Sequence, residues 1–146
     1  MLRILFTLLT LCVLALTSQA EAPNNQSDFL NYTVQHTVFN STFVPAEIAK
    51  IYKLKRSAYE SLINVSVYSN EKPMQTIAAD ISGSVRNLMQ QKTKLKFIEI
   101  KEQNAVYYLA PVRINGEETL HFELEVKPSS TDTELKINFD QKVYSD

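Results

Sequence analysis

Glycine, cysteine and histidine are scarce in this sequence, and tryptophan is absent. Gly83 and Gly116 are the only glycines, so there is no glycine-rich loop to cradle a phosphate or a dinucleotide. For the same reason no serine sits in the Gly-x-Ser-x-Gly elbow of a hydrolase. The carboxylates lie at alternating positions, which is typical of charged side chains on a protein surface. We therefore predict no catalytic set and no cofactor.

The two histidines lie in different sequence patterns. His121 alternates with Glu123 and Glu125, which would allow a weak surface metal site. His36 shares one side of a predicted strand with Val34 and is expected in the core or at its boundary. We interpret them as two unrelated histidines, because a metal site needs more ligands on one shared face.

The single cysteine lies in a segment that we expect to be removed. Arg3 gives the N-terminus a positive charge, and residues 4–16 are apolar or nearly so. Ser18 and Ala20 then fit the small-x-small pattern of a signal-peptide cleavage site. The apolar stretch is too short to span a membrane, which takes about 20 apolar residues. We predict a cleavable signal peptide over residues 1–20 and a mature start at Glu21, with cleavage after residue 22 as the alternative.

Loss of residues 1–20 removes Cys12 and Arg3 and leaves a mature chain without cysteine. Its basic residues fall from 15 to 14 against 16 acidic ones, so the formal charge is 14 − 16 = −2. This balance argues against a nucleic-acid partner, which requires a clustered positive surface. No apolar run of membrane length follows residue 22, so we expect no transmembrane segment in the mature chain.

Alternation of apolar and polar side chains predicts strands through most of the mature chain. Turn residues separate them, as at Asn115-Gly116 and residues 128–132. The seven predicted strands cover residues 32–38, 62–68, 76–85, 95–101, 105–114, 120–127 and 135–143. They predict a mainly all-β domain over residues 29–146, an antiparallel β-sandwich of immunoglobulin-like architecture. Residues 21–28 are polar and are expected to form a flexible N-terminus.

One segment breaks the β pattern. Pro45 suits the first turn of a helix, and Thr42 is a candidate cap. Ile48, Ile51 and Tyr52 fall on one helical face. We predict one short helix over residues 45–52 that packs this face on the edge or end of a sheet.

Basic residues gather in two places. Functionally they could contact anionic lipid head groups or an acidic partner. Cations also suit a helix C-terminus and protect a strand edge from aggregation, and we favour this second interpretation. The first group follows the predicted helix and the second begins a later strand: Lys50, Lys53, Lys55 and Arg56, then Lys92, Lys94 and Lys96.

Short motifs in order along most of the mature chain resemble a family of exported Gram-negative bacterial proteins, the domain of unknown function DUF4426. The resemblance implies a periplasmic location, with secretion as the alternative, and a single small domain. It implies no activity, cofactor or catalytic residue. The motifs are residues 39–49 with Tyr52 and Arg56-Ser57, Gly83 with Arg86-Asn87-Leu88, residues 106–108, and Asn115 with residues 117–120.

Loops that place polar residues beside aromatic ones often form binding sites, and one loop of this chain has this composition. The same residues could instead satisfy the loop backbone and anchor the helix, and we favour that architectural role. The candidate binding surface consists of Phe39, Asn40, Thr42, Phe43, Arg56, Arg86 and Asn87.

The function that these observations favour is a non-enzymatic binding or accessory module for a protein or another envelope component. One alternative is an enzyme with an unrecognised site near Arg56 and Arg86. The other is a purely structural envelope protein.

Overall fold

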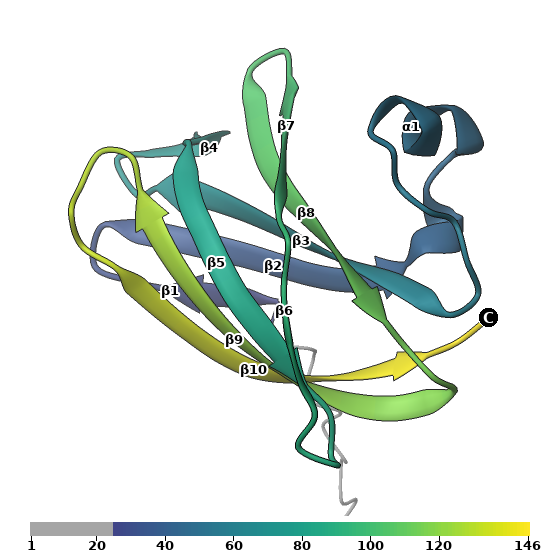
Figure 1. Ribbon diagram of the computed structural model, residues 1–146. Helices are drawn as coiled ribbons and strands as arrows, with labels where there is room; N and C mark the ends of the chain where they lie inside the picture. The colour runs from purple at the N-terminus through teal and green to yellow at the C-terminus, as the bar shows by residue number, and fades with distance from the viewer. Residues whose placement is uncertain (1–24) are drawn as a thin grey trace, which may run out of the picture.

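The structure is a computed structural model and describes residues 25–146 (Figure 1). Within this range, ten antiparallel strands form two sheets that pack face to face. Their bounds are β1 (Gln26–Asp28), β2 (Tyr32–Asn40), β3 (Glu60–Ser69), β4 (Lys72–Thr76), β5 (Ala79–Arg86), β6 (Lys92–Lys94), β7 (Ile98–Glu102), β8 (Ala105–Arg113), β9 (Glu117–Pro128) and β10 (Leu135–Tyr144). One sheet has the order β1-β2-β3-β8-β7, with β4 paired to β3, and the other has the order β10-β9-β5-β6. The predicted β-sandwich is confirmed.

Residues 25–146 contain ten strands rather than about seven. The three that alternation missed are β1, β4 and β6, which are short and mostly exposed. A strand with no buried face carries no apolar alternation in its sequence. The predicted flexible N-terminus is therefore wrong at Gln26–Asp28, which pairs with β2, while residues 1–20 lie outside the described residues.

Another difference concerns residues 95–101, predicted as one strand. The chain leaves the four-stranded sheet after β6 and enters the six-stranded sheet at β7. Leu95, which is buried at this crossing, donates its N–H to the Gly83 carbonyl at 2.9 Å. A change of sheet within one apolar segment explains why Phe97 and Ile98 disturb its alternation.

Aromatic rings connect the two sheets inside the core. His36 of β2 stacks on Phe139 of β10 with ring centroids 3.9 Å apart, and Phe139 stacks on Phe122 of β9 at 4.8 Å. His36 is buried, as predicted, and burial lowers the pKa of its imidazole. Phe122 and its aliphatic neighbours fill the space between the two inner faces.

A helical excursion lies at one end of the sandwich (Figure 1). It contains the 3₁₀ helix η1 (Ser41–Phe43) and the helix α1 (Ala46–Ile51). The predicted helix is confirmed but its predicted buried face is wrong, because Ala49 is only 3% exposed and Ile51 is 67% exposed. The small side chain of Ala49 lets the helix approach Leu62 of β3 closely.

The predicted cap of this helix is also wrong. Pro45 occupies the N-cap position and makes no side-chain cap hydrogen bond. Thr42 lies in η1 instead, and its hydroxyl is used in another contact.

Candidate functional site

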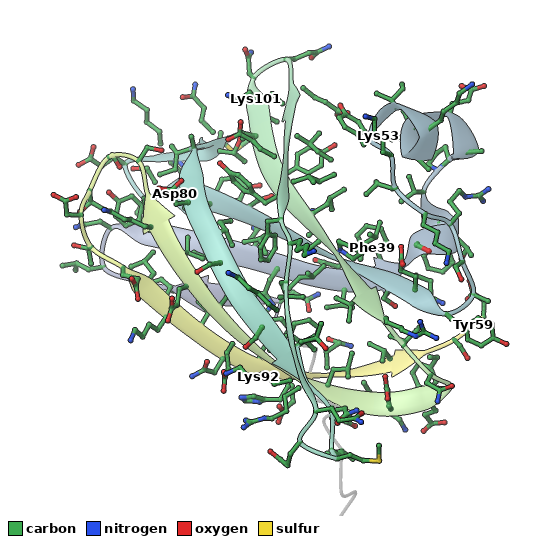
Figure 2. The ribbon with its side chains drawn as sticks, in the orientation of Figure 1. Phe39, Lys53, Tyr59, Asp80, Lys92 and Lys101 are labelled. Atoms are coloured by element: carbon green, nitrogen blue, oxygen red, sulfur yellow. The ribbon has the colours of Figure 1, made fainter. Side chains whose placement is uncertain are left out.

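The predicted binding residues fall into two groups. Phe39, Asn40, Thr42, Phe43 and Arg56 lie at the helix-bearing end of the six-stranded sheet, in β2, in η1 and after α1. The other two, Arg86 and Asn87, lie at the end of β5 in the four-stranded sheet. In Figure 2, Lys53 and Tyr59 mark the first region and Lys92 marks the second.

Three polar residues of the first group join in one network around Asp146. The side-chain amide of Asn40 and the hydroxyl of Thr42 each donate to one oxygen of the Asp146 carboxylate. Arg56 donates from Nη2 to the Thr42 carbonyl at 3.0 Å, and Ser61 donates to Asn40 Oδ1 at 3.2 Å. These contacts tie η1, the segment after α1 and the segment after β10 to one another.

A pair of serines fastens the base of the excursion, and sequence reasoning missed it. Ser41 is buried, and its hydroxyl donates to the Ser57 carbonyl at 3.1 Å. The same oxygen accepts the Ser57 N–H at 2.9 Å. Both ends of the excursion are thereby joined, so its exposed side chains project from a defined backbone.

Aromatic side chains surround a hollow at this end. Phe43 is 73% exposed, although it is one of the largest apolar side chains of the chain, and Tyr144 is also exposed. Lys142 stands 5.4 Å above the Tyr144 ring, and its hydrogen bond to Glu117 raises the pKa of the Lys142 amine. We call this site the Phe43 hollow; it measures about 270 Å³ and is lined by Val38, Phe39, Asn40, Phe43, Ser61, Lys142, Val143 and Tyr144.

In the second group, Arg86 belongs to a charged cluster on the outer face of the four-stranded sheet. Glu123 lies 3.6 Å from Arg86 and 2.6 Å from the Lys92 amine, and Ser84 donates to it at 3.4 Å. The hydrogen bond and the charge of Lys92 are the main causes that lower the pKa of Glu123. A carboxylate held ionised in this way is a weak base, which is unsuited to general acid–base catalysis.

Asn87 closes the loop between β5 and β6. Its side-chain oxygen accepts the Gln91 N–H at 3.0 Å, and its amide donates to Gln91 Oε1 at 2.7 Å. In the same loop, Gln90 adopts a positive φ of 64°. The contacts of Asn87 hold the loop in one conformation.

The structure does not bring Arg56 and Arg86 together. Arg56 follows α1 and contacts Thr42 beside the six-stranded sheet, whereas Arg86 ends β5 in the four-stranded sheet and contacts Glu123. The part of the chain that the structure describes holds no group of three or more His, Cys, Asp or Glu residues placed to bind a metal ion. It also holds no helix long and apolar enough to cross a membrane.

Comparison with known proteins identifies the family. Residues 26–146 match the model of the domain of unknown function DUF4426. The chain belongs to this family. The crystal structure of a DUF4426 family protein from Pseudomonas aeruginosa is similar, with a TM-score of 0.74 and 29% identity over 83% of this chain and 94% of that chain. The resemblance seen in the sequence motifs is confirmed.

Other solved structures share the fold of this DUF4426 protein. FetP of the uropathogenic Escherichia coli strain F11, expressed in the periplasm of E. coli, has a TM-score of 0.59 and 10% identity over 82% of this chain and 93% of that chain. A copper-bound variant of FetP has a TM-score of 0.59 and 11% identity over 82% and 94% of the two chains. At this identity the likeness shows the fold alone. No curated protein matches the DUF4426 chain in sequence.

Proposed function

We propose that this DUF4426 protein is exported and works in the periplasm as a non-enzymatic binding module that holds an envelope protein at the Phe43 hollow. The observation that carries the proposal is the 73% exposure of Phe43 at the edge of a hollow with a fixed backbone. Aromatic residues of this kind are the usual anchors of protein interfaces. Exposure of a phenylalanine side chain to water does not contribute to the stability of the fold.

The size and lining of the hollow favour a protein partner over a small molecule. Its volume of about 270 Å³ lies below the roughly 300–1,000 Å³ that is usual for small-molecule pockets. Phe39, Phe43 and Tyr144 offer aromatic surface, and Lys142 stands at the rim. One apolar side chain of a partner protein would fit this lining.

Export is supported by the signal pattern of residues 1–20. Cell fractionation followed by N-terminal sequencing tests this part of the proposal. We expect the periplasmic fraction to hold a chain that begins at Glu21. A chain that keeps Met1 and stays in the cytoplasm would contradict export.

The enzyme alternative has less support. Arg56 and Arg86 use their guanidinium groups in separate local contacts, with Thr42 and Glu123. An active site needs such groups to converge on one reacting atom. A purely structural role predicts no separable partner, so the experiment below distinguishes it from binding.

Photo-crosslinking in living cells tests binding at the hollow. A crosslinking amino acid replaces Phe43 in one strain and Leu30 in a control strain, because Leu30 is 92% exposed and lies in the β1–β2 connection. We expect one reproducible envelope protein from position 43, lost when Arg56→Ala loosens η1, and not recovered from position 30. No adduct from position 43, or the same adducts from both positions, would overturn the proposal.

A further inference from the structure

A second exposed apolar group lies at the tip of the β5–β6 hairpin. Leu88 and Met89 are adjacent in sequence and are 76% and 73% exposed. The loop that carries them is held by the contacts of Asn87 with Gln91. In Figure 1 this hairpin projects below the sandwich, away from α1, and it belongs to the four-stranded sheet. The tip is therefore a separate feature from the Phe43 hollow.

The hairpin is basic in its second half. Residues 81–98 contain four cations, Arg86, Lys92, Lys94 and Lys96, and no acidic residue. Glu123 of β9 pairs with the first two, but Lys94 and Lys96 make no ion pair within residues 25–146. Around the tip, Arg113 and Glu118 line the same hollow as Met89, so they balance each other in charge. Arg86 and Lys92, which flank the loop, share the single carboxylate of Glu123, so one net positive charge remains at the base of the tip, and Lys94 and Lys96 add positive charge further along the chain.

We propose that the β5–β6 hairpin inserts Leu88 and Met89 into the surface of an anionic lipid bilayer. Peripheral attachment of this kind takes two weak signals, apolar side chains that enter the acyl boundary and cations that stay at the head groups. Lysine side chains can extend along such a surface while their amines remain in water. The hairpin supplies both signals in one segment of the chain.

The shape of the tip favours a bilayer over a protein. A stable protein interface buries about 800 Å² on each partner and needs complementary surfaces. Two side chains at the apex of a five-residue loop offer far less, whereas a bilayer requires no complementary shape. The inference does not depend on the proposed partner at the Phe43 hollow.

The absence of tryptophan makes the insertion directly measurable. We would prepare the chain from Glu21, which contains the whole sandwich, with the single substitution Leu88→Trp. Its emission should shift to shorter wavelength with vesicles of phosphatidylglycerol and phosphatidylcholine in equal parts, and not with phosphatidylcholine alone. Leu30→Trp is the control, since that position is exposed outside the hairpin, and its emission should stay constant.

Sedimentation with the same vesicles measures the contribution of the two apolar side chains. We expect the double variant Leu88→Ser, Met89→Ser to bind at least tenfold more weakly, about the loss expected when two apolar groups no longer enter the acyl boundary. The matched control Leu30→Ser, Met74→Ser changes the same residue types at positions that are 92% and 93% exposed, and should bind normally. An unchanged emission of Leu88→Trp, or equal binding by both double variants, would overturn the inference.

Discussion

Phe122 and Phe43 have the same side chain in opposite surroundings. Phe122 is 0% exposed and stacks on Phe139 between the sheets, whereas Phe43 is 73% exposed at the helix-bearing end. Burial of apolar surface explains the presence of a phenylalanine in the core. It does not explain one in water, so the comparison separates residues that maintain the fold from residues that are free to bind.

The two regions are also held together differently. The core around Phe122 depends on packing between the inner faces of two sheets. The region around Phe43 is held by hydrogen bonds, from Asn40 and Thr42 to Asp146 and from Arg56 to Thr42. Packing stabilises the whole domain, whereas the hydrogen bonds fix the conformation of one loop.

The largest expected effect comes from removing the buried ring. Phe122→Ala should lower the free energy of unfolding by about 3–5 kcal/mol, because it leaves a cavity and breaks the stack with Phe139. Phe43→Ala, the matched variant, should change it by less than about 0.5 kcal/mol. Urea unfolding followed by circular dichroism measures both. Similar losses for the two variants would remove the distinction between the regions.

Gly83→Ala tests how closely the strands approach inside the core region. A Cβ at Gly83 would lie 2.5 Å from the Glu123 carbonyl oxygen and 2.8 Å from Leu124 Cδ2. We expect a loss of about 1–3 kcal/mol in the free energy of unfolding, as for other overpacked sites. Gly116→Asn is the control, because no atom lies within 4 Å of a Cβ there and Asn tolerates its positive φ. A neutral Gly83→Ala would contradict the close approach.

Asn40→Ala tests the hydrogen bonds that fix the loop. It removes the contacts with Asp146 and Ser61, and should cost about 1 kcal/mol of unfolding free energy. It should also reduce crosslinking from position 43, because the residue directly before η1 no longer contacts Asp146. Asn87→Ala removes a comparable pair of contacts in the hairpin and should leave that crosslinking intact. Equal crosslinking in both variants would show that the network does not shape the site.

The smallest effect at neutral pH is expected for His36→Phe. Burial lowers the pKa of His36 below the unfolded value of 6.5, so the unfolded chain binds the proton more readily. Its contribution to stability is complete above pH 6.5 and declines as the pH falls below that value. His36→Phe keeps the ring stacked on Phe139 and removes Nε2, which has no hydrogen-bond partner among residues 25–146. The stability of the variant at pH 7 should therefore be nearly unchanged.

Urea unfolding between pH 7 and pH 5 measures this effect. The variant should lose less stability than the wild-type chain as the pH falls. An identical decline in both proteins would contradict the assignment to His36.

The sequence predicted the elements that bury a face, and the structure confirms them. Strands β9 and β10 alternate strictly, because each has one face in the core and one in water. The short strands β1, β4 and β6 bury almost nothing, so no periodic signal marks them. The buried face of α1 was missed because Ala49 is less hydrophobic than Ile48 or Ile51, although its small size decides the packing.

The candidate site was predicted only in part. The motif around Phe39 and Phe43 pointed to the helix-bearing end, where Asn40, Thr42 and Arg56 do meet. Arg86 had been grouped with them, but it belongs to the other sheet. The role of Asp146 depends on where the last strand ends in space, and a single sequence carries no signal for such long-range contacts.

The central claim is that Phe43 serves binding and not stability. The most direct measurement combines two readings on Phe43→Ser. They are the free energy of unfolding and the yield of the envelope adduct from a crosslinker at position 144, which also lines the hollow. Our account predicts unchanged stability and a lost adduct, while Leu30→Ser leaves both unchanged. An undiminished adduct, or an adduct lost together with several kcal/mol of stability, would contradict it.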